Sequence, residues 1–330
     1  MTRVLVTGTA GFIGFHLAQS LLHAGMTVTG FDGMTDYYDV SLKRRRHDIL
    51  GNFDRFSAVE AMLEDRAALE TAFEAAKPDL VVHLAAQAGV RYSLEHPEAY
   101  VGANLVGSFH VLELARHAKV SHLLMASTSS VYGGNESLPF QESEPTQQPL
   151  TLYAATKVAN EAMAHAQAHV WGLPITMLRF FTVYGPWGRP DMALFKFVKA
   201  TLAGKAIDVY GQGKMARDFT YIDDIVRAVT LLAQAEPPAT GALGASPTAP
   251  FRVVNIGHGA PVGLMDFVAE IERVLGRPTK RTYLPMQTGD VESTFADVSL
   301  LTSLTGFRPQ VPISQGIPAF VNWYREYYGV

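Results

Sequence analysis

The stretch RVLVTGTAGFIG, residues 3–14, joins an apolar run to three regularly spaced glycines. Residues 3–7 are rich in Val and Leu, which is typical of a parallel strand buried on both faces. Gly8, Gly11 and Gly14 follow as GxxGxxG, and apolar residues then recur at helical spacing up to Gly25. Glycine permits a tight turn, and the N-terminus of a helix attracts phosphate. The stretch therefore predicts a strand–turn–helix unit that binds a pyrophosphate.

The same alternation continues through the first half of the chain. Further apolar strand patterns occupy residues 26–32, 79–86, 122–127 and 175–181, and helical patterns occupy residues 65–76, 97–118 and 152–171. Strands that alternate with helices in this way predict a parallel sheet covered on both faces. We therefore expect an α/β fold with a Rossmann-type, doubly wound parallel sheet over residues 1–180.

The rhythm becomes irregular after residue 180, which indicates a smaller C-terminal domain over residues 181–330. We expect helices at 190–205, ended by Gly204, at 221–235, and at 314–328, where Pro318 should limit or bend the first turn. Residues 236–250 are rich in Pro, Gly and Ala and predict an exposed loop. The pattern at 252–257 predicts a strand that returns to the main sheet, so segments near 217–235 and 252–260 should rejoin the first domain.

Composition narrows the class of protein. The 330 residues are 48% hydrophobic, carry a net charge of −4 and include no cysteine. This charge does not favour a nucleic-acid or membrane-surface partner, and the absence of cysteine excludes disulfides and thiolate metal sites. We find no secretory signal and no apolar run near the roughly 20 residues that span a bilayer. None of the 11 histidines has metal-ligand spacing, so we expect no metal site. Because we find no secretory signal and no membrane span, we expect a cytoplasmic location.

An acidic residue ends the second predicted strand. Asp32 lies 18 residues after Gly14, where a carboxylate accepts hydrogen bonds from the adenosine ribose and repels a 2′-phosphate. This favours NAD over NADP. The basic run Lys43–Arg46 complicates the choice, because arginines near that ribose accept a phosphate. We prefer the interpretation that this run is a solvated helix face.

Tyr153 and Lys157 stand four residues apart in YAATK, which places both on one face of the helix predicted over 152–171. A free tyrosine has a pKa of about 10, and lowering it to about 7 requires roughly 4 kcal/mol of stabilisation. A nearby ammonium and a nicotinamide cation both favour the phenolate. Tyr153 then accepts the proton of a substrate hydroxyl as hydride leaves its carbon. YxxxK alone is common by chance, but its position after the preceding strand–helix alternation favours catalysis.

Four consecutive hydroxyl residues, Ser127–Ser130, end the preceding strand. In a doubly wound sheet, ligands bind beyond the carboxyl ends of the strands. One of these hydroxyls can therefore bridge Tyr153 and the substrate oxygen, and the others can contact another part of the substrate. The alternative is that Ser129 or Ser130 only caps the backbone at the strand end. For Ser127, a role in the strand end is the better explanation.

Six separated motifs then resemble a known family: TGTAGFIG, HLAAQAGVRYS, STSSVYGG, YAATKVANE, RFFTVYGPWGRPDMALFKF and ARDFTYIDDI. Together they resemble an extended short-chain dehydrogenase/reductase that epimerises UDP-sugars with bound NAD. The segments DGMTDYYDVSLKRRR and FFTVYGPWGRPDM resemble the UDP-glucuronate 4-epimerase branch most. The resemblance implies conversion of UDP-glucuronate to UDP-galacturonate through a 4-keto sugar, and a homodimer built from helices 97–118 and 152–171.

The resemblance also implies roles for individual residues. Thr128, Tyr153 and Lys157 are the implied catalytic residues. The implied cofactor-binding residues are Gly8, Gly11, Phe12, Ile13, Gly14, Asp32, Lys43, Met62, Leu63, Leu84, Ala85, Ala86, Asn104, Ser127, Tyr153 and Lys157. The implied substrate-binding residues are Thr128, Ser129, Ser130, Thr182, Arg189, Arg217 and Asp290. Within this set, Ser129, Ser130 and Thr182 should hold the sugar carboxylate away from the alignment in which a β-keto acid loses CO₂.

Two positions depart from the family pattern. Met62 stands where an Asp usually binds the adenine amino group, and Gln287 stands where an Arg often binds phosphate. Three alternatives stay open: a UDP-glucuronate decarboxylase, a 4-epimerase of neutral UDP-hexoses, and a non-catalytic NAD-binding protein. The hydroxyl run and TVYGPWGRPDM argue against the first two, and the presence of Tyr153 and Lys157 argues against the third.

Overall fold

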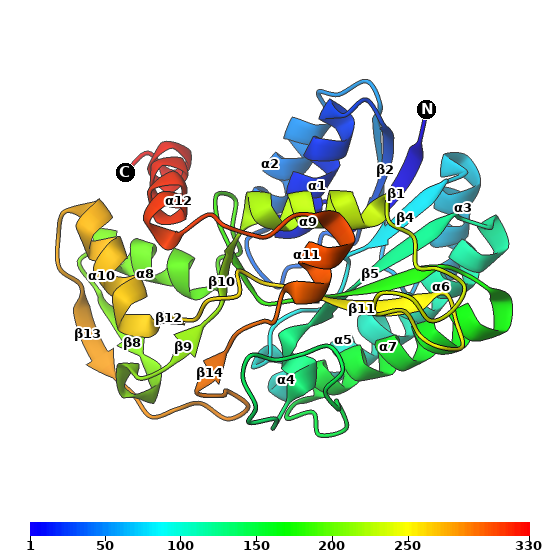
Figure 1. Cartoon of the computed structure of the whole chain (residues 1–330). Helices are drawn as coiled ribbons and strands as arrows, with labels where there is room; N and C mark the ends of the chain where they lie inside the picture. The colour runs from blue at the N-terminus through cyan, green and yellow to red at the C-terminus, as the bar shows by residue number, and fades with distance from the viewer.

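The computed structural model describes all 330 residues and is built on a seven-stranded sheet (Figure 1). Its strand order is β11-β6-β5-β4-β1-β2-β3, and every neighbouring pair is parallel. The order reverses after β1, so the sheet is doubly wound, and the predicted fold class is confirmed. The strand bounds are β1 Arg3–Thr7, β2 Thr27–Asp32, β3 Phe56–Glu60, β4 Leu80–His83, β5 His122–Thr128, β6 Ile175–Phe180 and β11 Phe251–Ile256.

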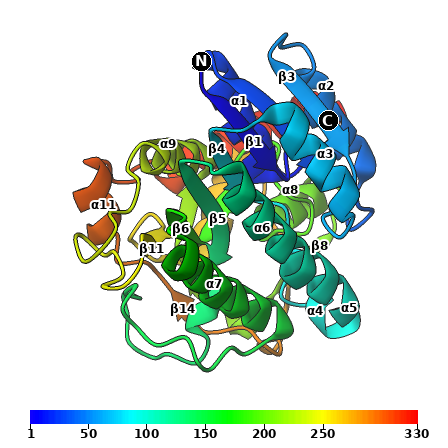
Figure 2. The same cartoon turned by 90° about the vertical axis from the view of Figure 1, so that its right-hand side faces the viewer.

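Helices cover both faces of this sheet (Figure 2). Val4 and Val6 point to one face and Leu5 to the other, as the alternation of a strand requires. The first face packs against α1 (Phe12–His23), α9 (Ile222–Ala233) and α11 (Ser299–Thr305). The second packs against α3 (Arg66–Ala76), α6 (Ser108–Ala118) and α7 (Leu152–Trp171). Two buried clusters on opposite faces thus hold the carboxyl ends of the strands at one rigid edge.

A separate apolar cluster organises much of the C-terminal region, at the left of Figure 1. It joins α8 (Ala193–Leu202), α10 (Leu264–Leu275) and α12 (Ile313–Tyr328) around aromatic side chains such as Phe195 and Phe267. Short strands complete the region: β7 Thr182–Tyr184, β8 Ala206–Val209, β9 Ala216–Arg217, β10 Phe219–Tyr221, β12 Val262–Gly263, β13 Lys280–Tyr283 and β14 Ser293–Thr294. The division of the chain into two domains at residue 180 stays a prediction.

The sequence patterns gave no bounds for two elements at one edge of the sheet, although residues 43–46 were expected on a helix. They are β3 and α2 (Val40–Leu50). β3 has no fully buried residue and therefore lacks the apolar pattern that marks the inner strands. α2 is dominated by charged residues, so its periodicity is weak. Within the C-terminal region, α12 continues through Pro318, contrary to the expected limit on its first turn.

The helix predicted over 97–118 is not one regular helix. It consists of α5 (Pro97–Tyr100), a π-helical segment at Val101–Gly107, and α6, and the short α4 (Tyr92–Glu95) precedes it. Inserted turns of this kind re-aim side chains and often occur at functional sites. This one lies beside the end of β4, which stops at His83 rather than at residue 86.

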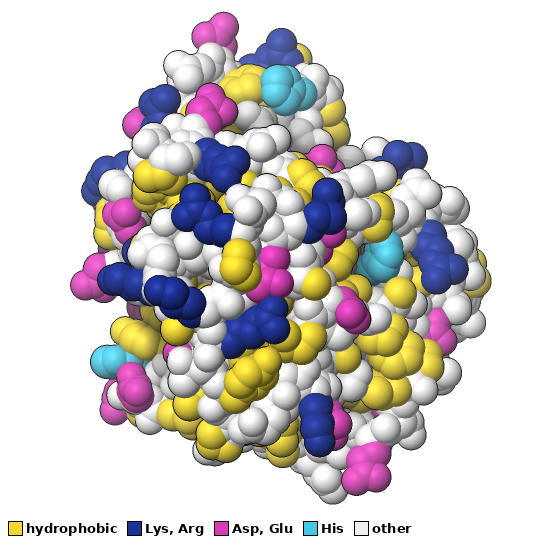
Figure 3. Space-filling view, turned by 90° about the vertical axis from the view of Figure 1, so that its left-hand side faces the viewer, with side chains coloured by type: hydrophobic (Ala, Val, Ile, Leu, Met, Phe, Trp, Pro, Cys, Tyr) yellow, Lys and Arg dark blue, Asp and Glu magenta, His cyan; other side chains and the backbone are white.

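The surface of the C-terminal region carries mixed charge: Figure 3 shows basic side chains interspersed with acidic ones. The predicted loop over residues 236–250 is irregular and mostly exposed. No helix has both the length and the apolar character needed to cross a bilayer.

Candidate active site

The glycine turn between β1 and α1 leaves no room for side chains. Gly8 has φ +83°, a conformation that favours glycine, and a Cβ there would lie 2.8 Å from the backbone nitrogen of Ala85. A Cβ at Gly14 would lie 2.0 Å from the carbonyl oxygen of Gly8. The turn therefore presents backbone and the start of α1 at the sheet edge, which fits a pyrophosphate.

Asp32 lies at the end of β2 beside this turn. Its side chain is 91% buried, and its two oxygens accept hydrogen bonds from the backbone nitrogens of Ala10 and Met34, each at 2.9 Å. These contacts fix the carboxylate and leave further acceptor positions on both oxygens. A ribose diol can use those positions, as predicted for NAD.

The interpretation of Lys43–Arg46 as a solvated helix face is wrong for two of its residues. Lys43 is buried and donates to the carbonyl and hydroxyl oxygens of Thr35 at 2.6 and 2.9 Å. Arg46 is fully buried and donates to the carbonyl oxygens of Ala10 and Trp187 at 2.6 and 2.5 Å. The run thus holds loops together, because helical spacing points its first and last residues inward.

One cleft joins most of the predicted residues. Its cavity volume of about 440 Å³ is ordinary for a small-molecule site. The predicted residues that line it are Gly8, Gly11, Phe12, Ile13, Gly14, Asp32, Lys43, Met62, Leu63, Leu84, Ala85, Ala86, Ser127, Thr128, Tyr153, Lys157 and Arg189. The cleft therefore runs from the glycine turn to the YxxxK residues along the carboxyl edge of the sheet, where an extended dinucleotide fits.

Tyr153 and Lys157 both lie on α7 at the inner end of this cleft. Burial raises the pKa of Tyr153, and a hydrogen bond with Thr128 and the positive charge of Arg189 oppose that rise. Burial lowers the pKa of Lys157 to about 8, and its ammonium donates to the carbonyl oxygen of Ala126 at 2.9 Å. In the protein alone the pKa of Tyr153 is therefore above its ordinary value, so the expected lowering needs bound ligands.

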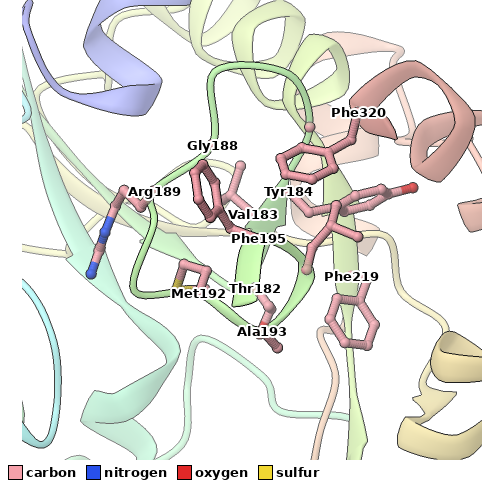
Figure 4. A pocket seen from close by; sticks show the side chains of 12 residues that line it. Thr182, Val183, Tyr184, Gly188, Arg189, Met192, Ala193, Phe195, Phe219 and Phe320 are labelled. Atoms are coloured by element: carbon pink, nitrogen blue, oxygen red, sulfur yellow. The ribbon is translucent and has the colours of Figure 1, made fainter. Parts of the chain in front are cut away.

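Arg189 reaches the same end of the cleft from the loop after β7, and its side chain points away from the aromatic packing around Phe320 (Figure 4). It donates to both oxygens of Asp191, at 3.0 and 2.5 Å. Asp191 also accepts from the hydroxyl of Tyr37 at 3.0 Å. The prediction from sequence included neither Asp191 nor Tyr37, and their separation of 154 positions in the sequence leaves no local signal.

The hydroxyl run Ser127–Ser130 divides into separate roles. Ser127 donates to Glu161 at 2.6 Å, and Arg179 binds the same carboxylate at 2.7 and 2.9 Å. Thr128 faces Tyr153, while its hydroxyl oxygen accepts from the backbone nitrogen of Ser130 at 3.2 Å. Glu161 follows Lys157 by one further helical step, so its spacing on α7 was a usable signal that the prediction missed.

Four predicted residues of this region do not line the cleft: Asn104, Ser129, Ser130 and Thr182. Ser129 and Ser130 lie in the short 3-10 turn that follows β5. Asn104 is fully buried in the π-helical segment and binds the backbone of Gln87 at 2.8 and 3.0 Å and the hydroxyl of Thr156 at 3.1 Å. It therefore ties α7 to the segment after β4. Thr182 starts β7 and is partly buried, beside the loop that carries Arg189.

Arg217 and Asp290 lie together in the C-terminal region. The guanidinium of Arg217 donates to the carbonyl oxygens of Val291 and Glu292 at 2.8 and 3.1 Å. Burial lowers the pKa of Arg217, and the charge of Asp290 opposes that effect. Asp290 also pairs with Arg91 at 3.4 Å, a second cation that the prediction missed. No substrate-binding role of these residues is tested by this geometry, and each stays a prediction.

Known proteins match this chain over its whole length. A probable UDP-glucuronate 4-epimerase of Rhizobium meliloti is 57% identical, over 99% of this chain and 98% of its own. UDP-glucuronate 4-epimerase 1 of Arabidopsis thaliana is 45% identical, over 99% of this chain and 77% of its own. A Bacillus cereus UDP-glucuronic acid 4-epimerase, solved with UDP-glucuronic acid and NAD, is 32% identical, with a TM-score of 0.89 over 99% and 100% of the two chains.

A family model described as the NAD dependent epimerase/dehydratase family matches residues 4–257. The match spans the glycine turn, the hydroxyl run, the YxxxK residues and β11, that is, the complete central sheet. The family suspected from the motifs and the choice of NAD as cofactor are thereby confirmed. On these grounds the chain belongs to the NAD dependent epimerase/dehydratase family.

Proposed function

We propose that this protein catalyses the NAD-dependent C4 epimerisation of UDP-glucuronate to UDP-galacturonate through a 4-keto sugar. The observation that carries the proposal is the meeting of Thr128, Tyr153 and Lys157 in the cleft that begins at the glycine turn. Bound NAD supplies a reversible acceptor for the C4 hydride. The relatives named as UDP-glucuronate 4-epimerases support this choice of substrate.

The protein's own residues supply the proton chemistry. Tyr153 accepts the proton of the sugar 4-hydroxyl, and Thr128 faces that phenol and acts to lower its pKa. Lys157 is held by the carbonyl oxygen of Ala126, where it places a positive charge at the inner end of the cleft. After the keto sugar has turned over, Tyr153 returns the proton to the C4 oxygen while the hydride would return from the cofactor to the opposite face of C4, so there is no net oxidation.

The sugar carboxylate needs separate control. The 4-keto form of a glucuronate is a β-keto acid, which loses CO₂ when its C–CO₂ bond aligns with the carbonyl π system. Ser129, Ser130 and Thr182 are short hydroxyl donors on the elements that follow β5 and β6. In the proposed function they hold the carboxylate out of that alignment, and Arg189 closes over the substrate.

Arg217 and Asp290 form the proposed site for the rest of the nucleotide. A guanidinium suits the pyrophosphate and a carboxylate suits the uridine ribose. Arg91 lies beside both and provides a further positive charge. In this assignment residues 1–180 form the NAD-binding domain and residues 181–330 the UDP-sugar-binding domain, and the first domain also supplies the residues that act on the sugar ring.

Product analysis tests this function against its alternatives. Purified protein is incubated with UDP-glucuronate, and the nucleotide sugars are separated by chromatography. UDP-galacturonate is the expected product. A UDP-pentose with CO₂ would identify a decarboxylase instead, and turnover of UDP-glucose but not UDP-glucuronate would identify a neutral-sugar epimerase. A protein that retains NAD and turns over none of these sugars would be the non-catalytic alternative.

We further propose a homodimer through α6 and α7, which lie side by side (Figure 2). Val106, in the π-helical segment, and Phe109, in the first turn of α6, are each 42% exposed. Trp171 is 57% exposed at the end of α7. Apolar side chains at this surface favour a covered interface. Sedimentation of the unaltered protein and of Phe109→Asp tests it, and a monomeric unaltered protein would contradict it. The cytoplasmic location stays a prediction.

A further inference from the structure

The segment that carries Met62 is held beside the ribose-binding carboxylate. The backbone nitrogen of Ala61 donates to the carbonyl oxygen of Asp32 at 3.2 Å. Leu63 is 94% buried, and its carbonyl oxygen accepts a hydrogen bond from His110 at 3.1 Å. Asp65 caps α3 by accepting from the backbone nitrogen of Ala68 at 3.0 Å. These contacts fix the backbone of residues 61–65 along the cleft. The carboxylate of Asp65 already accepts a hydrogen bond within the chain.

Glu64 is different from its acidic neighbour. It lines the cleft together with Met62, and its Oε2 atom is buried without a hydrogen-bond partner. Its Oε1 atom lies against Gly102, where a Cβ would come within 2.6 Å. The carboxylate thus occupies a space that Gly102 leaves open in the π-helical segment. A buried acceptor with no donor indicates a place for a donor from outside the chain.

Glu64 lines the same cleft as Asp32, so the missing donor should be a group of the dinucleotide that binds there. Asp32 is the predicted partner of the adenosine ribose, and Met62 and Glu64 line the same cleft on the segment that Ala61 ties to Asp32. An adenine base on that ribose would therefore face Met62 and Glu64. An adenine base carries one exocyclic donor, its 6-amino group. Met62 offers only a thioether, which is a weak acceptor, whereas a carboxylate is a strong one.

We propose that Glu64 accepts a hydrogen bond from the adenine 6-amino group of NAD, while Met62 packs against the base. This inference rests on the proposed use of NAD and assigns base recognition to a residue two positions beyond the family's usual Asp. It makes the preference of the cleft for adenine depend on Glu64. A base without the amino group leaves the carboxylate unpaired.

Exchange of the bound dinucleotide tests this role without a measurement of activity. Protein is equilibrated with equal excesses of NAD and of the analogue that has purine in place of adenine, and the retained dinucleotides are separated and quantified. We expect the unaltered protein to retain NAD about tenfold in preference, as befits a hydrogen bond to a charged group. Glu64→Ala should retain both about equally, and Glu64→Gln, which keeps an acceptor oxygen, should fall between.

Glu70→Ala is the matched control, because Glu70 lies exposed on α3 and pairs only with Arg66. It should keep the full preference, and Met62→Asp, which adds an acceptor, should increase it. An unchanged preference in Glu64→Ala would overturn the inference, as would equal retention of both dinucleotides by the unaltered protein. An unaltered protein that retains neither would instead contradict the proposed use of NAD.

Discussion

At the glycine end of the cleft, the backbone of Gly8, Gly11 and Gly14 forms the binding surface beside Asp32. At the hydroxyl end, Ser127, Thr128, Tyr153, Lys157 and Arg189 bring together side chains from three separate segments, and Ser129 and Ser130 follow just outside this lining. The first end depends on what is missing, since each glycine contacts backbone that a Cβ would strike. The hydroxyl end depends on the hydroxyl and charged groups that its side chains bring into the cleft. Substitutions at the glycine end should therefore lower NAD binding and stability. Substitutions at the hydroxyl end should lower turnover while the fold stays intact.

The largest effect is expected for Tyr153→Phe, which tests whether the hydroxyl end is needed for turnover but not for NAD binding. Tyr153→Phe removes only the phenolic oxygen, so turnover of UDP-glucuronate should fall by about 10²–10⁴-fold while NAD stays bound. Steady-state kinetics and the dinucleotide content of the purified variant measure the two quantities. Near-normal turnover would show that another group moves the proton. Loss of NAD would show that the Tyr153 hydroxyl is also needed for cofactor binding.

Glu161→Gln tests the support beneath the hydroxyl run. Arg179 is 96% buried in its side chain, and its pair with Glu161 lies under Ser127. Because a buried arginine would be left without its counter-charge, the free energy of unfolding should fall by about 3–5 kcal/mol. Urea denaturation measures this change.

The matched control is Glu70→Gln, which breaks the exposed pair with Arg66 and should cost at most about 0.5 kcal/mol. Equal losses in the two variants would mean that the hydroxyl end does not rest on the buried pair.

Gly14→Ala tests the glycine end. Its Cβ would lie 2.0 Å from the carbonyl oxygen of Gly8, so the turn must shift. We expect a loss of about 1–3 kcal/mol in stability and the loss of most bound NAD. Gly134→Ala is the control, because the nearest atom to its Cβ would be 3.8 Å away. Normal NAD content in Gly14→Ala would contradict the view that this end binds by shape.

The smallest effect is expected on the ratio of products and not on the rate of turnover. Replacement of both Ser129 and Ser130 by Ala should raise the UDP-pentose by-product severalfold relative to the epimer, because about 1 kcal/mol of carboxylate positioning is lost. Chromatography of the products measures the ratio. Ser137→Ala, outside the cleft, should leave it unchanged. If the double variant also leaves it unchanged, the two serines only cap the strand end.

The two ends also differed in how well the sequence predicted them. GxxGxxG, Asp32 and YxxxK were predicted from their spacing and from their place in the strand–helix alternation, because turn geometry and helical periodicity are local properties. The buried state of Lys43 and Arg46 was not found, because burial depends on the loops at Ala10 and Trp187 that pack over α2. β3 was not found because an edge strand with no fully buried residue lacks a strong pattern. The π-helical segment within the helix predicted over 97–118 was not predicted, because it is tied to the chain elsewhere, as by the contact of Asn104 with Gln87.

By itself the sequence determined the doubly wound sheet, the order of its motifs and the residue types for phosphate binding and proton transfer. These depend on neighbours along one strand or helix. Only the tertiary structure decided which polar groups pair: Asp191 accepts from both Arg189 and Tyr37, Glu161 pairs with Arg179, and Arg217 lies beside Asp290. It also left the Glu64 carboxylate unpaired in the cleft. Such pairing depends on distances of a few ångströms between segments far apart in the chain, and spacing in a sequence does not contain those distances.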